Sequence, residues 1–252
     1  MPASPPGVVN VVSNAPRDAG ARGRRPDRAP GRATRQFHRI LAASARSSPS
    51  IAPEHLKPVL LELGGKSPLL VLDDADVEAA VAAAAFGAFA NQGQICMSTE
   101  RIVVDETIAD DVRRAFRRES KVALGRRPAR GQRPCSGSLV DRSAAERVTA
   151  LVLDAGRQGG QAAGRWQRQR HARSTRTCST MSRPRCASID EESFGPVATV
   201  VRAKGEDEAV RIANDTPYGL AAAVFSRDVN RAFRGGAAPR HRHLPRQWAN
   251  RA

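Results

Sequence analysis

The sequence predicts an α/β fold built around a parallel sheet. Two observations carry this prediction. First, short apolar runs typical of strands alternate with helix-like segments in residues 54–124 and again in 189–228, and that alternation is typical of βαβ units. Second, Leu, Ile, Val and Phe fill 22 of the 71 positions in 54–124, which is enough to build a core there.

The first stretch opens with a strand, a turn and a second strand. Residues 55–72, HLKPVLLELGGKSPLLVL, contain two apolar runs separated by GGKS. Asp73–Asp76 then supply an N-cap and a negative first turn for an Ala-rich helix. We expect this helix to end near Asn91–Gly93, with an apolar face made by Val77, Val81, Phe86 and Phe89.

The remaining elements follow the same alternation. Cys96 lies just past the end of that helix, and the run RIVV after it predicts a strand. Residues 107–124 form an amphipathic pattern, which predicts a helix. In 189–228, FGPVATVVRA predicts a strand, GEDEAVRIAND a helix with acidic residues at its start, and YGLAAAVFS a second strand or a short helix.

The net charge of +16 is unevenly distributed. Residues 1–53, 125–188 and 229–252 carry +7, +11 and +6, and the basic residues there are all Arg, whereas 54–124 and 189–228 each carry −4. Core-building residues fill only 6 of 64 positions in 125–188. We therefore expect 125–188 to be mostly disordered and 229–252 to be a disordered basic tail.

Several classes of protein are disfavoured by composition. The sequence has no apolar run of eighteen residues and no secretory signal pattern at its start, so we expect a cytoplasmic protein without a membrane partner. The four cysteines, at 96, 135, 178 and 186, show no paired spacing and no neighbouring His cluster. We therefore expect neither a disulfide framework nor a metal site.

Two residues are candidates for chemistry. Glu62 stands inside an apolar run, where an unpaired carboxylate is costly and usually has a partner or a role. Cys96 follows a helix, and a free cysteine taken alone is more often a small buried apolar residue. Together they could form a thiolate nucleophile with a nearby base.

These residues carry a resemblance to a family. LLELGGKSP, followed 34 positions after its Glu by the Cys of GQICMSTERI, resembles the catalytic core of the NAD(P)-dependent aldehyde dehydrogenase superfamily. The resemblance implies that Glu62 is the general base and Cys96 the nucleophile. EESFGPV at 191–197 resembles the family's nicotinamide-contacting motif, which implies cofactor contacts for Glu192 and Phe194. For Glu192 and Phe194, a purely structural role in the remaining fold explains the motif as well as cofactor contact does. Gly64 of the same LGGK string is a further cofactor-side candidate, although a turn that needs a positive φ or a close approach is its simplest explanation.

The family's chemistry agrees with these residue types. A thiolate attacks the aldehyde carbonyl, hydride passes to NAD or NADP, and water deprotonated by the Glu releases the acid. The resemblance implies a small aldehyde substrate, and it implies a fold that is part of an aldehyde dehydrogenase catalytic domain. Family members are homo-oligomers, an assembly that is not expected to carry over to a partial domain.

The sequence departs from the family in its Arg-rich blocks. Members are close to twice this length, and their oxyanion-hole Asn and adenosine-ribose Lys have no counterpart here, so we expect the chain to be inactive or impaired. Codons permitted for Arg22–Ile40, read one base later, give a string ending in the family's FTGS, and 174–188 and 236–252 also give family-like strings in a shifted frame. We infer frame-shifted stretches in 1–53, a remnant of the dinucleotide-binding domain, and in the two later blocks. The last recovered string, ICHVNGPTV, resembles the benzaldehyde and salicylaldehyde dehydrogenase branch, which implies an aromatic aldehyde.

A second function class follows from charge alone. Arg-rich arms on an acidic core would bind phosphate backbones without sequence preference. The basic blocks contain only Trp166 and Trp248 as large stacking residues, and they contain no recognisable nucleic-acid module. The alternative is therefore a non-enzymatic basic protein with non-specific nucleic-acid binding, and we expect no specific nucleic-acid partner.

Overall fold

The computed structural model describes residues 35–38, 59–125, 138–162, 178–181 and 186–237. The chain divides into two compact units, residues 1–64 and 65–252. In the first unit, strands β1 (Arg35–His38) and β2 (Val59–Glu62) pair in parallel. None of the helices in the described part of the chain has the length and apolar character needed to cross a membrane.

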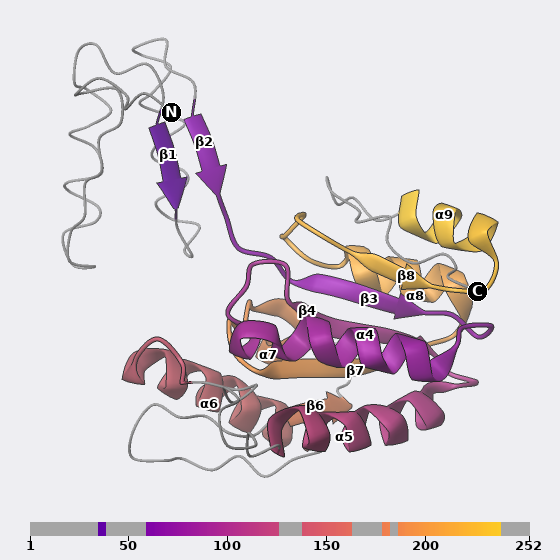
Figure 1. The fold of residues 1–252 in the computed structure, drawn as a ribbon, viewed down its shortest axis with the longest axis horizontal. Helices are drawn as coiled ribbons and strands as arrows, with labels where there is room; N and C mark the ends of the chain where they lie inside the picture. Colours follow the sequence, from indigo (N-terminus) through magenta and orange to yellow (C-terminus); the bar gives the residue numbers. More distant parts are fainter. Residues whose placement is uncertain (1–34, 39–58, 126–137, 163–177, 182–185, 238–252) are drawn as a thin grey trace, which may run out of the picture. The chain divides into compact units, whose positions relative to one another are not determined.

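The second unit is built on a six-stranded sheet in the order β5-β6-β7-β4-β3-β8 (Figure 1). Neighbouring strands run parallel except at the edge, where β5 is antiparallel to β6. The strands are β3 (Ser67–Val71), β4 (Thr99–Asp105), β5 (Gln161–Ala162), β6 (Cys178–Met181), β7 (Val197–Ala203) and β8 (Ala223–Phe225). The parallel α/β sheet predicted from the sequence is confirmed.

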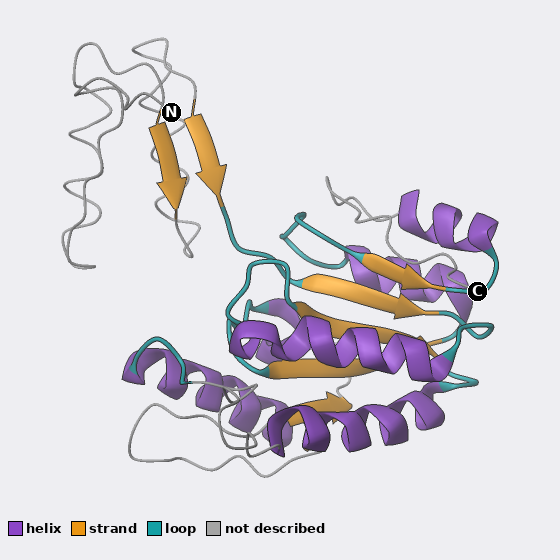
Figure 2. Cartoon of the chain, in the orientation of Figure 1, coloured by secondary structure: helices purple, strands orange, loops and turns teal. Residues whose placement is uncertain are grey.

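Helices pack on both faces of this sheet (Figure 2). Apolar side chains of α4 and α5 pack with Leu69, Val71 and Ile102 on one face, while α7 and α8 pack with Leu70 and Val103 on the other. The helices are α4 (Val77–Phe89), the short 3-10 helix η3 (Ala90–Gly93), α5 (Ala109–Gly125), α6 (Arg142–Arg157), α7 (Ala187–Asp190), α8 (Gly205–Asn214) and α9 (Val229–Ala237). The central strands are therefore buried on both sides, as is usual for a parallel sheet.

Local signals explain where α4 begins and what it packs on. The Asp76 carboxylate accepts a hydrogen bond of 3.0 Å from the Ala79 amide, so the predicted acidic N-cap is present. At the other end the Phe89 ring stacks on Phe116 of α5, with ring centroids 5.8 Å apart. This contact fixes the last turn of α4 directly ahead of the segment that contains Cys96.

Two helices correct the predictions for the basic blocks. Within 125–188, predicted to be mostly disordered, α6 is a helix of 16 residues whose Val148 and Val152 are buried. The predicted disordered tail is wrong for Val229–Ala237, which form α9. Arg231 of α9 bonds to Asp73 and Glu206, and these contacts hold the helix against the turn after β3 and the first turn of α8. The predictions of disorder for 126–137, 163–177, 182–185 and 238–252 lie outside the described residues, as does most of 1–53, the predicted remnant of the dinucleotide-binding domain.

Candidate active site

The sequence motifs gather at the edge of the sheet where its parallel strands begin. Gly65 and Lys66 directly precede β3, Cys96 precedes β4, and the segment Glu192–Phe194 precedes β7. Because β3, β4 and β7 are mutually parallel, their amino ends meet at one edge. Many open α/β sheets bind ligands at the opposite, carboxyl edge, so this candidate site is built from the loops that enter the strands.

A reversal of the backbone after α4 delivers Cys96 to this edge. Asn91, Gln92 and Gly93 adopt φ values of 49°, 58° and 68°, in the left-handed region that ends helices. A turn follows, in which the Ser98 amide donates to the Ile95 carbonyl at 2.9 Å. Cys96 lies in this turn, is partly exposed and forms no disulfide. The cysteine is therefore in the thiol form and partly accessible to solvent.

Two glycines allow the three loops to approach one another closely. A Cβ added to Gly65 would overlap the carbonyl oxygen of Cys96, and one added to Gly93 would overlap the carbonyl oxygen of Gly195. Backbone therefore packs on backbone at both places, and a side chain there would separate the loops. Gly65 and Gly93 link the cysteine loop to the LGGK and FGP motifs.

Gly93→Ala should destabilise the folded protein by about 1–3 kcal/mol, since an alanine would be strained at this positive φ and would also collide with Gly195. Thermal unfolding followed by circular dichroism measures the effect. Gly156→Ala is the matched control, because a Cβ there meets no atom within 4 Å. Equal unfolding temperatures for Gly93→Ala and wild type would contradict this account of the loop.

Buried charges tie the same loops together. Lys66 Nζ donates to Glu100 Oε2 at 2.5 Å, and both side chains are almost fully buried. The Glu100 carboxylate also accepts hydrogen bonds from the amides of Ser193 and Phe194. Glu192 Oε1 in turn accepts from the Gly65 amide at 3.0 Å. The segment that leads into β7 is therefore anchored to both of the other loops.

Burial raises the pKa of the Glu192 carboxyl, and the nearby charge of Glu100 adds to the rise, while the hydrogen bond from Gly65 and the charge of Arg147 oppose it. Only 8% of the residue is exposed, so desolvation of the charged form is the dominant cause. Folding therefore favours the protonated carboxyl. The resulting stabilisation is present below the ordinary pKa of a Glu and is lost as the pH rises through the raised value.

Glu192→Gln should remove the loss of stability that Glu192 causes at higher pH, because the amide stays neutral and its oxygen can still accept from the Gly65 amide. The variant should gain stability relative to wild type as the pH rises from about 4 to about 7. Urea unfolding of both proteins across this range measures the difference. Glu191→Gln, at an exposed neighbouring position, controls for the loss of one negative charge from the same loop. A difference in the free energy of unfolding between wild type and variant that stays constant with pH would contradict a raised pKa of the buried Glu192 carboxyl.

Helix α6 and Gln94 support the loops from outside. Arg147 of α6 donates to the Glu192 carbonyl at 2.9 Å, and a Cβ on Gly195 would lie 2.6 Å from a methyl carbon of Val148. Gln94 Oε1 accepts from the Val140 amide at 2.8 Å. The helix that composition failed to predict thus forms part of the support of the candidate site.

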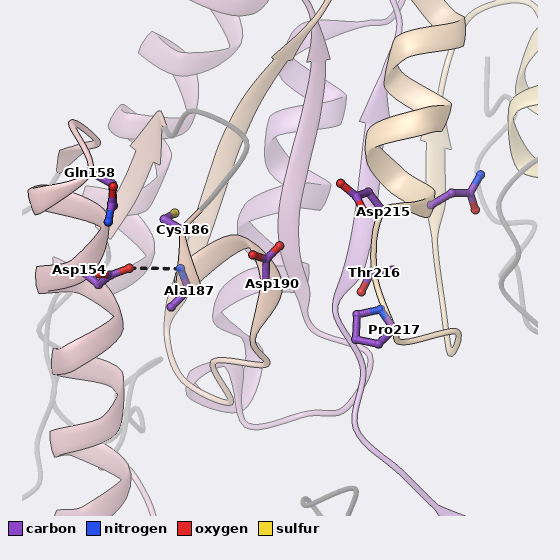
Figure 3. Close-up of a pocket in the computed structure, with 9 residues that line it drawn as sticks. Asp154, Gln158, Cys186, Ala187, Asp190, Asp215, Thr216 and Pro217 are labelled. Atoms are coloured by element: carbon purple, nitrogen blue, oxygen red, sulfur yellow. Dashed lines mark hydrogen bonds between the residues drawn. The ribbon is translucent and has the colours of Figure 1, made fainter.

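A separate pocket of about 710 Å³ lies between α6, α7 and the loop that follows α8 (Figure 3). Its lining includes three carboxylates, and one of them, Asp154, accepts from the Ala187 amide at 3.1 Å. The residues that line it are Asp154, Gln158, Cys186, Ala187, Asp190, Asn214, Asp215, Thr216 and Pro217. This set contains none of the predicted site residues, so the pocket is distinct from the candidate site.

The structure brings part of the predicted site together. Cys96, Glu192 and Phe194 lie on loops in direct backbone contact, as described above. Glu62 is the last residue of β2 and Gly64 follows it, and both belong to the first compact unit, so their pairing with Cys96 stays a prediction. Sequence reasoning missed Lys66 and Glu100. The sequence did contain a signal for this pair. Each of two apolar strands has a charged residue at its start, and charged residues are rarely buried unless they are paired.

The residues 3–239 match the model of the aldehyde dehydrogenase family. The chain belongs to this family. Vanillin dehydrogenase of Pseudomonas fluorescens is 45% identical over 234 residues, which cover 90% of this chain and 46% of the relative. Salicylaldehyde dehydrogenase of Pseudomonas sp. strain C18 is 43% identical over 241 residues, 92% of this chain and 48% of the relative.

Solved aldehyde dehydrogenase structures share this fold. The crystal structure of a salicylaldehyde dehydrogenase from Pseudomonas putida G7, complexed with salicylaldehyde, matches with a TM-score of 0.80 at 39% identity, over 91% of this chain and 47% of that one. This aldehyde dehydrogenase family chain therefore spans about half the length of the relatives it matches.

Proposed function

We propose that the chain carries the catalytic half of an aldehyde dehydrogenase that oxidises an aromatic aldehyde to the acid with NAD or NADP. The observation that carries the proposal is the backbone contact of the Cys96 loop with the loop of Glu192 and Phe194, made through Gly65 and Gly93. A partly exposed free cysteine then lies on a loop in contact with a segment that contains a carboxylate and an aromatic ring. Family membership supplies the reaction class.

Cys96 is the nucleophile in this proposal. Its thiolate adds to the aldehyde carbon, forming a C–S bond and an oxyanion. Loss of hydride from that carbon restores the carbonyl as a thioester. Glu62 deprotonates a water, which cleaves the C–S bond, and the products are the carboxylic acid and the free thiol. The nicotinamide cofactor, when bound, supplies the hydride acceptor.

Glu192 and Phe194 are the residues that would hold the nicotinamide side of the cofactor. These two side chains fit the nicotinamide riboside, because a carboxylate can accept hydrogen bonds from ribose hydroxyls and an aromatic ring offers a flat apolar face. Phe194 adopts a φ of 44° and is partly exposed, and its amide donates to Glu100 Oε1 at 3.1 Å. Gly64 is a further cofactor-side candidate.

The relatives support an aromatic substrate. Two of them are named for vanillin and salicylaldehyde, and both compounds are hydroxylated benzaldehydes. We expect turnover by the 252-residue chain to be slow, since a missing oxyanion donor typically costs about 10²–10³-fold in rate. Nothing in the described residues favours the alternative of a nucleic-acid-binding protein.

The experiment is aldehyde oxidation by the purified chain. Salicylaldehyde, vanillin and a short aliphatic aldehyde are incubated separately with NAD+ or NADP+, and reduced cofactor is followed by absorbance while the acid is quantified by chromatography. Slow formation of both products in equal amounts, faster with the aromatic aldehydes, supports the proposal. Preference for the aliphatic aldehyde, or the absence of both products at high enzyme concentration, would count against it.

A further inference from the structure

Glu100 is a buried carboxylate with more hydrogen bonds than an ion pair requires. It is the second residue of β4, and its side chain is 3% exposed. A charge buried to this extent is tolerated only when it is paired and hydrogen-bonded. Lys66 supplies the pairing charge, and the remaining hydrogen bonds to Glu100 come from the segment that leads into β7.

Those donors are two successive backbone amides. Glu100 Oε1 accepts from Ser193 N at 3.0 Å and from Phe194 N at 3.1 Å, while Oε2 accepts from Ser193 N at 2.8 Å. Consecutive N–H groups that converge on one anion form a nest, a backbone shape that an anion stabilises. Bonds from an amide to a charged acceptor are stronger than those to a neutral one.

The nest lies where the backbone is strained. Phe194 has a φ of 44°, which bulky residues rarely adopt and which costs free energy unless surrounding contacts enforce it. The carboxylate from β4 provides such contacts from outside the loop. In addition, Glu100 connects three segments. It lies four residues after Cys96, it pairs with Lys66 directly before β3, and it accepts from the Ser193–Phe194 turn before β7.

We propose that Glu100 is a positioning residue whose carboxylate holds the Ser193–Phe194 turn in its left-handed conformation, so that Phe194 is fixed beside the Cys96 loop. The value of this conformation for catalysis rests on the proposed function, in which Phe194 meets the nicotinamide. The hydrogen bonds from the Ser193 and Phe194 amides to Glu100 belong to the folded chain and need neither cofactor nor substrate.

The test replaces Glu100 by Gln and follows the two amides. Hydrogen exchange at Ser193 and Phe194, measured without cofactor, should become about 10- to 100-fold faster when a charged acceptor is replaced by a neutral one. Exchange in α8 should stay as in wild type, which separates a local release from global unfolding. Glu191→Gln removes an exposed charge from the same loop and should leave both amides protected.

A second variant guards against failure to fold. Glu100→Gln leaves Lys66 as a buried, unpaired cation, so the double variant Lys66→Met/Glu100→Gln removes both charges together. It should fold and still show fast exchange at Ser193 and Phe194. Unchanged exchange at these amides in a folded variant lacking the carboxylate would overturn the proposal.

Cofactor affinity provides a functional readout. In titrations with NAD+ or NADP+ alone, loss of the carboxylate should weaken binding by about 10-fold, in line with the loss of one charge-assisted contact. Faster hydrogen exchange at Ser193 and Phe194 together with an unchanged affinity for the cofactor would overturn the positioning role. A wild-type chain that binds neither cofactor would count against the proposed function, and the exchange comparison would still decide whether Glu100 holds the turn.

Discussion

Cys96→Ala should abolish aldehyde oxidation, with a fall in rate of about 10³-fold or more, because the substitution removes the thiol that forms the thioester in the proposed reaction. Acyl transfer offers a readout that needs no cofactor. An activated ester such as p-nitrophenyl acetate should acetylate the partly exposed Cys96 thiol of the wild-type chain, and mass spectrometry with peptide mapping locates the label. The variant should lose the label in the peptide spanning this position.

Cys186→Ala is the matched control for that experiment. Cys186 is also a free cysteine, but it is 5% exposed and its sulfur lies 3.0 Å from the Ser188 hydroxyl. Its removal should change neither the turnover nor the acetylation of Cys96. Undiminished turnover in Cys96→Ala, or acetylation that maps chiefly to another cysteine, would remove Cys96 from the role of nucleophile.

Arg101→Met should produce the largest loss of stability, about 3–5 kcal/mol, because it strips donors from several buried carbonyls at once. The Arg101 side chain is fully buried, and its guanidinium donates to the carbonyl oxygens of Lys66, Ile212 and Ala213 at 3.2, 3.0 and 2.8 Å. Burial lowers the pKa of Arg101 to about 10, against the opposing influence of Asp190, Asp215 and Glu100. The residue therefore remains charged at neutral pH.

Urea unfolding at neutral pH measures the effect of Arg101→Met. Arg211→Met is a matched control on α8, the helix whose last carbonyls Arg101 binds, since Arg211 is exposed and forms a surface ion pair with Glu208. That change should alter the free energy of unfolding by less than about 1 kcal/mol. Similar denaturation midpoints for the two variants would show that Arg101 does not hold α8 to the sheet.

Much of the fold was predictable because its elements carry strong local signals. Each of these signals lies within a short stretch of sequence, as the Asp76 cap, the Ala-rich pattern of α4 and the apolar run of β7 show. Helix α6 was missed because the composition was averaged over 125–188. The six Leu and Val residues of that block all lie between Leu139 and Leu153, and a narrower window reveals an amphipathic helix there.

The candidate site was only partly predictable for a different reason. Cys96, Glu192 and Phe194 lie in motifs with recognisable spacing, whereas the roles of Glu100 and Arg101 depend on partners far along the chain. Glu100 bonds to amides 93 and 94 positions away, and Arg101 to carbonyls more than 100 positions away. No local pattern encodes such partners, because they meet only when parallel strands bring distant segments to one edge.

The location of the candidate site at the amino ends of the strands leaves the carboxyl edge of the second unit available for engineering. The turn between β4 and α5 lies on that edge, and its Glu106 and Thr107 are exposed. A short peptide inserted between these two residues would attach a fluorophore or an immobilisation handle at the end of β4 remote from Cys96. Exposed turns are where such insertions succeed most often, so the chain could be coupled to a solid support through the end of β4 remote from Cys96.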